Sequence, residues 1–265
     1  MISVQDLHVT FNPGTPLERR AVNGIDLTLH EGEFATVIGS NGAGKSTLLA
    51  AIAGDVAVER GRIEIGGRDV TRQAPARRAA RVARVFQDPL AGSCAALSIE
   101  ENLALAAMRG VRRGLASALN AGRRALLRER VAELGLNLED RMGDRMGLLS
   151  GGQRQALALV MATLAGAEVL LLDEHTAALD PGMAEFVVEL TQRLVKAHGL
   201  TTLMVTHSMR QALDLGTRTV MLHEGRIVLD ITGERRSSMD VDDLVAMFRK
   251  VRGGEELDDD SLRIG

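Results

Sequence analysis

The sequence has very little of several things on which proteins commonly rely. It contains one cysteine, Cys94, so no disulfide can form within the chain, which fits a reducing cytosol. We expect that cysteine to be a small residue that is buried or half-buried. Tryptophan and tyrosine are absent and aromatic residues make up 2%, which argues against a base-stacking surface for nucleic acid. The formal net charge is −3, so no overall positive field favours nucleic acid either.

Long apolar runs are also missing. The longest stretch, ALALVMATLAGAEVLLL, is broken by Glu168 and leads directly into two acidic residues. It is typical of a buried helix followed by a buried strand, not of a membrane span. The N-terminus has charge and alternation where a signal peptide would have an apolar block. Lysine is scarce as well, because only three of the 32 basic residues are lysines: Lys45, Lys196 and Lys250.

What the sequence does contain is an alternation of apolar strands and helices. The segment FATVIGS, residues 34–40, is an apolar run that ends in glycine, which is typical of a buried central strand. EVLLLDE and LTTLMVTH repeat this pattern between helical segments, and TVMLHEGRIVLD indicates a hairpin that turns at residues 224–225. Such alternation predicts an α/β fold with a mostly parallel sheet. The N-terminal third is strand-like, and a helical middle rich in Ala, Leu and Arg is inserted.

The first motif, GSNGAGKST, occupies residues 39–47 directly after the predicted central strand and matches G-x-x-x-x-G-K-[ST]. Its glycines, Gly39, Gly42 and Gly44, let the backbone curl and expose consecutive N–H groups to an anion. A helix beginning near Lys45 directs its positive end at the same place, and that lysine adds a charge for the outer phosphates. A glycine-rich turn alone does not explain why a scarce lysine lies here. The motif therefore predicts a nucleotide site.

Two carboxylates follow another apolar strand, at the sheet edge where ligand sites of α/β proteins form. Asp173 is expected to hold Mg²⁺ through water, and Ser46 offers it a hydroxyl. Glu174 is expected to take a proton from the water that attacks the γ-phosphate. His207 ends the strand LMVTH and Gln87 ends RVFQ, so both are candidates to reach the same edge. A solvated acidic loop is the alternative, and the phosphate loop upstream argues against it.

A third motif, LLSGGQRQ, begins a long apolar helix. Ser150 and Gln153 form the spacing of a capping box, in which each side chain bonds the other residue's backbone. Gly151 and Gly152 remove side chains from the start of the helix, although glycine lowers helix stability. We infer that something approaches this helix start closely. Because exposed amides favour an anion, we expect a phosphate of the same nucleotide.

Over residues 1 to 235, the chain resembles the ATP-binding subunit of an ABC transporter. GSNGAGKST resembles the Walker A motif, VFQDP the Q-loop, LSGGQ the signature, VLLLDE the Walker B motif, ALD at 178–180 the D-loop, and His207 the switch histidine. The resemblance implies a P-loop NTPase (RecA-like) fold, ATP and Mg²⁺ as ligands, and ATP hydrolysis. It also implies a head-to-tail dimer with a second copy, in which each signature closes on the ATP of the partner subunit's Walker A loop.

The resemblance assigns roles residue by residue. Glu174, His207 and Gln87 would be catalytic; Ser46, Gln87 and Asp173 would hold the metal; Asp180 would belong to the D-loop; Ser150, Gly151, Gly152 and Gln153 would act in trans. The ATP-binding residues would be Phe11, which either stacks on adenine or belongs to the core, and Gly39, Ser40, Asn41, Gly42, Ala43, Gly44, Lys45, Ser46 and Thr47.

The resemblance also divides the chain. Residues 1–235 would form the ATPase domain, with a core of 1–86 and 164–235, an N-terminal antiparallel β subdomain and an inserted helical subdomain of about 87–163. Residues 236–265 would form a C-terminal helix and an acidic tail. His175 is a departure, because most members have proline after DE. The stretch DEHTAALDP resembles a small subgroup that accompanies amino-acid-type importers.

These features predict an ATPase that powers import of a small solute, such as an amino acid, through separate membrane permease subunits, with a periplasmic or extracellular substrate-binding protein as a further expected partner. The chain would lie at the cytoplasmic face of the membrane as a peripheral subunit. One alternative is a soluble ABC-type ATPase acting on DNA or the ribosome, but such relatives usually carry long insertions or a second cassette. Another is a regulator that binds ATP without turnover, against which Glu174 and His207 argue.

Twelve arginines lie between Arg72 and Arg130, against four acidic residues. A basic face near anionic headgroups and ordinary solvated helix faces are the two interpretations that the sequence leaves open.

Overall fold

The computed structural model describes residues 1–111, 118–251 and 253. The acidic tail predicted at the C-terminus lies outside these residues. In the described residues the elements follow one another as β1 Ile2–Phe11, β2 Arg19–Leu29, β3 Phe34–Gly39, α1 Lys45–Ala53, β4 Arg60–Ile65, β5 Arg68–Asp69, α2 Pro75–Arg78, β6 Val82–Val85, α3 Ile99–Ala107, α4 Ala121–Ala132, the 3-10 helix η1 Met146–Leu148, α5 Gly151–Thr163, β7 Val169–Asp173, α6 Pro181–His198, β8 Thr201–Val205, α7 Met209–Asp214, β9 Arg218–His223, β10 Arg226–Thr232, α8 Gly233–Ser237 and α9 Val241–Val251.

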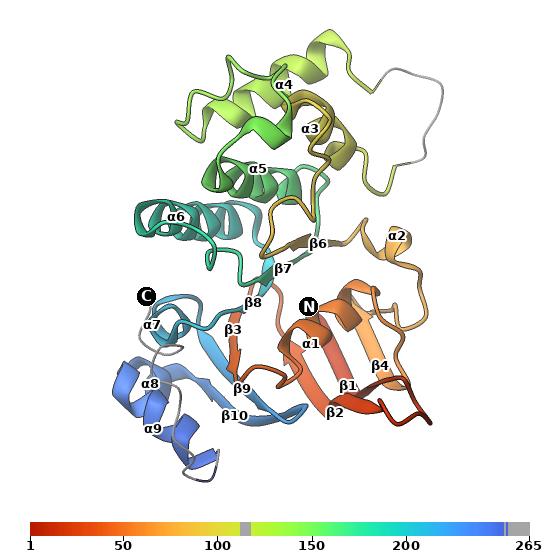
Figure 1. Ribbon diagram of the computed structural model, residues 1–265, viewed down its shortest axis with the longest axis vertical. Helices are drawn as coiled ribbons and strands as arrows, with labels where there is room; N and C mark the ends of the chain where they lie inside the picture. Colours follow the sequence, from red (N-terminus) through yellow and green to blue (C-terminus); the bar gives the residue numbers. More distant parts are fainter. Residues whose placement is uncertain (112–117, 252, 254–265) are drawn as a thin grey trace.

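The central layer is a six-stranded sheet in the order β10-β9-β3-β8-β7-β6, and these strands follow one another upward through the molecule in Figure 1. Its strands pair in parallel except for the antiparallel pair β9 and β10, which confirms the predicted mostly parallel α/β fold. Strand β7 explains why such strands are apolar throughout. Successive side chains of a strand point to opposite faces, and Leu170 and Leu172 join one buried cluster while Val169 and Leu171 join another.

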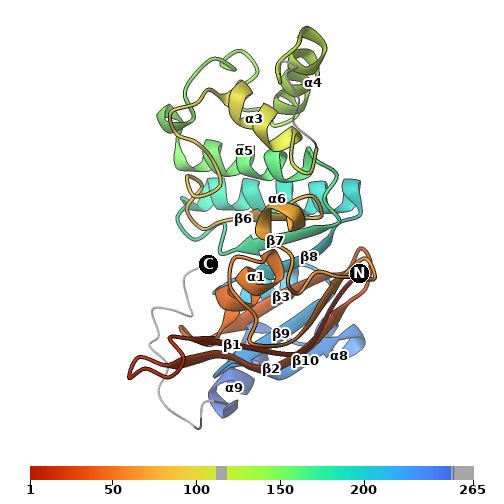
Figure 2. The same ribbon diagram turned by 90° about the vertical axis from the view of Figure 1, so that its right-hand side faces the viewer.

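A second sheet, β2-β1-β4-β5, is antiparallel and lies against one face of the central sheet (Figure 2). Its apolar residues, among them Leu7, Ile25 and Ile63, pack in one cluster with Leu48 and Leu49 of α1. The predicted strands around residues 25–29 and 63–65 belong to this sheet. The sheet therefore buries α1 and fixes the loop before it.

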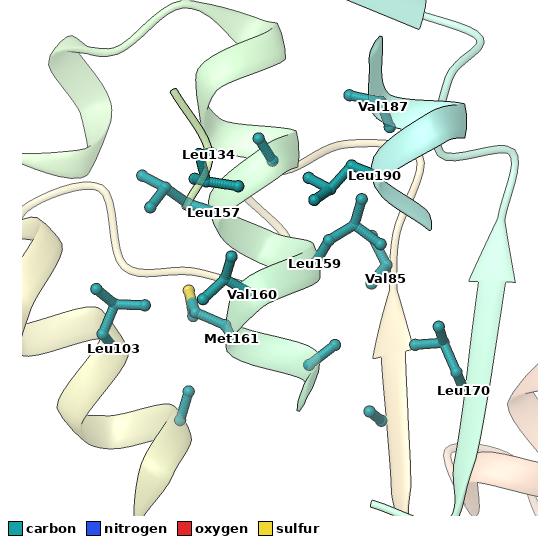
Figure 3. Packing of buried hydrophobic residues seen from close by; sticks show 14 of the residues in the cluster. Val85, Leu103, Leu134, Leu157, Leu159, Val160, Met161, Leu170, Val187 and Leu190 are labelled. Carbon is teal, nitrogen blue, oxygen red and sulfur yellow. The ribbon is translucent and has the colours of Figure 1, made fainter. Parts of the chain in front are cut away.

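Helices α3, α4 and α5 lie between β6 and β7 in the chain and gather at one end of the molecule (Figure 1). Figure 3 shows how α5 packs: Leu159 points toward Val85 of β6 and Leu190 of α6, and Val160 lies on the side of Leu103 of α3. This packing seats the helical segment on the edge of the central sheet.

The end of the described chain returns to the central sheet. The hairpin β9–β10 turns at Glu224 and Gly225, which have φ angles of 46° and 75°, as a tight hairpin turn requires. Helix α9 then buries Leu244 and Phe248 with Met209 of α7. The predicted hairpin and the predicted amphipathic segment VDDLVAMFRKV are both present.

Arginines of the helical middle have partners within the chain. The guanidinium of Arg78, which is 2% exposed, donates to the carbonyls of Ala51 and Ile52 at the end of α1. Arg109 donates in the same way to Met161 and Ala162 at the end of α5. A cation at a helix C-terminus satisfies free carbonyls and the helix dipole. These two arginines therefore stabilise the fold instead of forming a basic surface.

One expectation about packing is wrong. Cys94 is exposed, not buried or half-buried, because it lies in the irregular segment between β6 and α3.

Across the described parts of the chain, no helix is both long and apolar enough to cross a membrane.

Candidate functional site

The loop between β3 and α1 is shaped by glycine. A Cβ atom on Gly39, whose φ is 149°, would lie 2.2 Å from the carbonyl oxygen of Leu222. On Gly44, whose φ is 101°, it would lie 2.3 Å from the carbonyl oxygen of Ala21. No other residue fits these two positions without moving the backbone. Gly44 also begins α1 without a side-chain cap, so the first amides of that helix remain available to an anion.

The lysine of this loop is folded into it. Lys45 is 5% exposed, and its Nζ donates to the carbonyl oxygens of Gly39, at 2.7 Å, and Ser40, at 3.2 Å. Burial lowers the pKa of Lys45, while the negative charges of Glu174 and Asp173 act in the opposite direction. The loop carbonyls therefore hold an amine whose charge is stabilised by the carboxylates of Glu174 and Asp173.

Ser46 and Asp173 are brought together although 127 positions separate them in the sequence. The hydroxyl of Ser46 donates to Oδ1 of Asp173 at 3.0 Å, because α1 begins beside the carboxyl end of β7. Within the described residues, no cluster of three or more His, Cys, Asp or Glu side chains could hold a metal by itself. A hydroxyl beside one carboxylate nevertheless fits Mg²⁺, which usually takes one or two protein oxygens and completes its shell with water and phosphate.

Glu174 and His207 form the second pair at this edge. Nε2 of His207 lies 2.6 Å from Oε1 of Glu174. Burial raises the pKa of Glu174, but the hydrogen bond with His207 and the charges of His207 and Lys45 outweigh it, so the pKa is below its usual value. Glu174 is therefore ionised and able to accept a proton. Its φ of 48° is unusual for a residue with a side chain, and its N–H donates to Val205 of β8.

The serine–glutamine pair before α5 forms the predicted capping box. Gln153 donates its N–H to Oγ of Ser150, and the N–H of Ser150 donates to Oε1 of Gln153. The lack of a side chain at Gly152 has a reason within the chain. A Cβ atom there would lie 2.4 Å from Cε and 2.9 Å from Cγ of Met183 in α6, so the Met183 side chain packs into the space that this glycine leaves. Gly151 is less crowded, with its nearest neighbour at 3.7 Å in the side chain of Leu179.

The capping box and the phosphate loop do not meet within one chain. Helix α5 lies with the helical segment, and α1 lies between the central sheet and the antiparallel sheet (Figures 1 and 2). Among the residues that the structure describes, no hydrogen bond or ion pair joins 150–153 to 39–47. Asp180 follows Leu179, whose side chain is the nearest neighbour of Gly151, and it caps α6 by accepting from the N–H of Met183 at 3.1 Å.

Gln87 and Phe11 are two further predicted site residues. The side chain of Gln87 is exposed, and none of the hydrogen bonds or ion pairs in the described residues includes it, so it does not reach Asp173 here. Phe11 is half-buried and packs beside the core cluster, with the guanidinium of Arg19 5.9 Å from its ring centre.

The residues of the loop between β3 and α1 differ in exposure. Asn41, Gly42 and Ser46 are exposed, and Ala43 and Gly44 are buried.

Sequence reasoning missed Arg84, in the middle of β6. Its Nη2 lies 2.7 Å from Oδ2 of Asp173, and its Nη1 lies 2.8 Å from Oδ2 of Asp55. The signal that could have identified it was a charged residue within the apolar run VARVF.

Sequence reasoning also missed the partner of His175. This histidine is 1% exposed, and its Nε2 lies 3.0 Å from Oγ1 of Thr191 in α6.

Comparison with known proteins agrees with this arrangement. The model of the ABC transporter family matches residues 22–177. The chain belongs to the ABC transporter family, and it is an ATP-binding subunit with ATPase activity.

Two curated relatives and one solved structure illustrate the similarity. The tyrosine transport ATP-binding protein of Clostridioides difficile (strain R20291) is 40% identical over 251 residues, which cover 94% of this chain and 98% of that protein. The thiamine import ATP-binding protein ThiQ of Yersinia pestis is 35% identical over 205 residues, or 77% and 82% of the two chains. The dimeric post-hydrolysis structure of the ATP-binding cassette MJ0796 with ADP and Pi superposes with a TM-score of 0.75 at 25% identity, covering 88% of this chain and 98% of that chain.

Proposed function

We propose that this subunit hydrolyses ATP to drive import of an aromatic amino acid such as tyrosine through separate membrane permease subunits. One observation carries the choice of solute: the similarity to the tyrosine transport protein extends over 94% of this chain and 98% of that relative. The similarity to the thiamine import protein covers less of both chains. We place the chain at the cytoplasmic face of the membrane, as a peripheral subunit bound to these permeases.

In the proposed reaction, the loop 39–47 binds the phosphates of ATP. The free amides at the start of α1 and the ammonium group of Lys45 neutralise their charge. Ser46 and Asp173 would hold Mg²⁺, which supplies further positive charge against the phosphate oxygens. Gln87, exposed in this structure, is proposed to join them when the helical segment moves, and Phe11 is proposed to contact the base.

Glu174 is the residue proposed to accept a proton. Its carboxylate is ionised, so it can accept the proton of the water that attacks the γ-phosphate. His207 holds Oε1 of that carboxylate at 2.6 Å and restricts its orientation. Fixing a general base in this way contributes to catalysis because the proton-accepting geometry is formed before the reaction begins.

The second half of each site is proposed to come from a second copy of the chain. The capping box at Ser150 is complete yet separated from the phosphate loop of its own chain, and it leaves Gly151 open at the helix start. A head-to-tail dimer would bring this helix start, with Asp180 nearby, to the nucleotide of the partner subunit. The dimeric cassette that superposes on this chain supports such an assembly. Residues 1–235 would act as one ATPase domain, with the helical segment 87–163 turned toward the permease.

A pocket of about 360 Å³ is the proposed docking place for the permease. The segment after β6 and helices α3 and α5 form it, and its apolar lining includes Phe86, Leu105 and Met161. Leu105 is 45% exposed, so part of its apolar surface is available to a docking partner. We propose that an apolar side chain of a short permease segment fills it.

Uptake in cells tests the solute. A strain that lacks this subunit is complemented with the wild type or with Glu174→Gln, and uptake of labelled tyrosine and labelled thiamine is measured. We expect only the wild type to restore tyrosine uptake, and neither form to change thiamine uptake. Restored thiamine uptake, or tyrosine uptake that does not depend on the subunit, would contradict the proposal. A substrate-binding protein, if the importer uses one, should co-purify with the permease and this subunit.

A further inference from the structure

A buried guanidinium lies against the carboxylate that is proposed to hold magnesium. Arg84 and Asp173 are only 14% and 13% exposed in their side chains, and Nη2 of the arginine lies 2.7 Å from Oδ2 of the aspartate. The two residues come from neighbouring strands, since β6 pairs in parallel with β7. This is therefore a largely desolvated ion pair, in which each charge depends on the other.

Both carboxylate oxygens of Asp173 have a partner within the protein. Oδ1 accepts from Ser46 at 3.0 Å, while Oδ2 faces Arg84. Protein groups alone thus give the carboxylate both a neutralising charge and a fixed orientation. An ionised carboxylate buried to this degree without a cation would be destabilising.

Arg84 is itself held by two further groups. Its Nη1 donates to Oδ2 of Asp55 at 2.8 Å, and its Cζ lies 4.6 Å from the centre of the Phe86 ring. Its Nε is buried and has no hydrogen-bond partner in the described residues. Asp55 is 42% exposed and would be solvated without the arginine, so it does not require a buried guanidinium. The group that requires one is Asp173.

We propose that Arg84 is the resident counter-cation of Asp173: it stabilises and orients this carboxylate in the metal-free protein, and it weakens the binding of Mg²⁺ at the same carboxylate. A guanidinium keeps its charge at all physiological pH values, so it repels a divalent cation permanently. The contacts with Asp55 and Phe86 continue to hold the guanidinium of Arg84 when Asp173 turns toward a metal. The inference rests on the proposed function in one respect, which is that Asp173 holds magnesium.

A stability cycle tests the first half without metal or nucleotide. Denaturant unfolding in EDTA is compared for the wild type, Arg84→Met, Asp173→Asn and the double variant. We expect Arg84→Met to lower the unfolding midpoint, and Asp173→Asn to recover most of that loss, because it removes the unpaired charge. Losses that simply add would overturn the proposal, since they would mean that the arginine acts through packing on Phe86. Arg81→Met is the matched control, because it removes the more exposed pair with Glu168 and should have little effect.

Metal binding tests the second half. Mg²⁺ is titrated calorimetrically into the protein–ADP complex with little free ADP. We expect Arg84→Met to bind Mg²⁺ roughly tenfold more tightly, because the repulsion between the fixed guanidinium charge and the nearby cation is removed. Arg84→Lys, which keeps the charge, should remain close to the wild type. Unchanged or weaker binding by Arg84→Met would overturn the proposal.

Asp173→Asn separates this inference from the proposed function. If this variant binds Mg²⁺ as tightly as the wild type does, magnesium is not held by Asp173, and both the metal assignment and the second half of the inference are wrong. If it loses Mg²⁺ binding while Arg84→Met shows no change, the metal assignment stands and only the role of Arg84 is wrong. The stability cycle decides the first half in either case.

Discussion

The carboxylate of Glu174 and the imidazole of His207 lie 2.6 Å apart, although 33 positions separate them in the sequence (207 − 174). The contact exists because β7 and β8 are parallel neighbours and both residues follow the carboxyl ends of these strands. Their arrangement leads to the first of five predictions.

Glu174→Gln should bind Mg-ATP and hydrolyse it about 10²–10⁴-fold more slowly, the usual contribution of a general base. The amide is nearly the same size as the carboxylate but cannot accept the proton. Single-turnover hydrolysis and nucleotide affinity are measured on the same preparation. Because the γ-phosphate stays intact, the variant should accumulate as an ATP-bound dimer in gel filtration. A loss of less than tenfold would show that Glu174 is not the base.

Lys45→Ala should abolish useful ATP binding, because the loop loses its only side-chain cation. The two carbonyls that Lys45 now contacts, Gly39 and Ser40, would remain directed into the loop. Nucleotide affinity is measured by calorimetry. Lys196→Ala is the control: it removes another of the three lysines from an exposed position of α6 and should bind ATP normally. Wild-type affinity in Lys45→Ala would refute the location of the site.

Ser150→Arg should leave ATP binding by the monomer nearly intact and abolish hydrolysis. The phosphate loop is untouched, whereas the bulky side chain blocks the start of α5, where the partner's γ-phosphate is proposed to dock. An equimolar mixture with Lys45→Ala is the sharper measurement. A mixed dimer has one site built from two undamaged halves, so its ATPase activity should exceed that of both parents.

That mixture separates action in trans from action within one chain. If the signature served the phosphate loop of its own chain, no mixture could assemble an intact site. The control is wild type mixed with the double variant, which shows whether one intact site is sufficient for turnover. If the control is active and verified mixed dimers of the two single variants are not, the dimeric site is wrong.

His175 should make the folded state less stable as the pH falls from about 6.5 toward 4. Burial lowers the pKa of His175 to about 4, because protonation would place a charge where its Nδ1 has no partner in the described residues. Between these values the unfolded chain binds more protons than the native one, so stability rises with pH and is fully present above 6.5. The full contribution is on the order of 3 kcal/mol.

Chemical unfolding at several pH values measures this slope, and His175→Gln is the matched variant. In the wild type, the hydroxyl of Thr191 donates to Val187 and its oxygen accepts from Nε2 of His175. Glutamine can preserve a donor to that oxygen but does not titrate. The difference in stability between the two proteins should therefore change between pH 6.5 and 4. An equal pH slope in the two proteins would exclude this role for His175.

Leu105→Glu should reduce ATP-driven transport while leaving the ATPase activity of the isolated subunit unchanged. Leu105 lines the pocket proposed for the permease, and a charge there would have to be desolvated on docking. Co-purification with the permease and transport in vesicles are measured together. Leu126→Glu provides the control, because Leu126 is 50% exposed on α4 and does not line the pocket. Equal transport by the two variants would argue against docking there.

The local features of the site could be read from the sequence because each depends on residues close together in the chain. The capping box needs only that Ser150 and Gln153 are three positions apart at a helix start. The conformations of Gly39 and Gly44 follow from a strand that turns directly into a helix. The carboxyl ends of apolar strands placed Asp173, Glu174 and His207 at one edge, since parallel strands meet there.

Contacts between distant elements were decided by the tertiary structure. The sequence suggested that a ligand explains Gly152, but packing of α5 on α6 places Met183 against it. Nothing local links Arg84 to Asp173 or His175 to Thr191, because these pairs depend on which strands and helices become neighbours. Burial then makes each pair important, since a desolvated charge or imidazole needs a partner that sequence spacing does not specify.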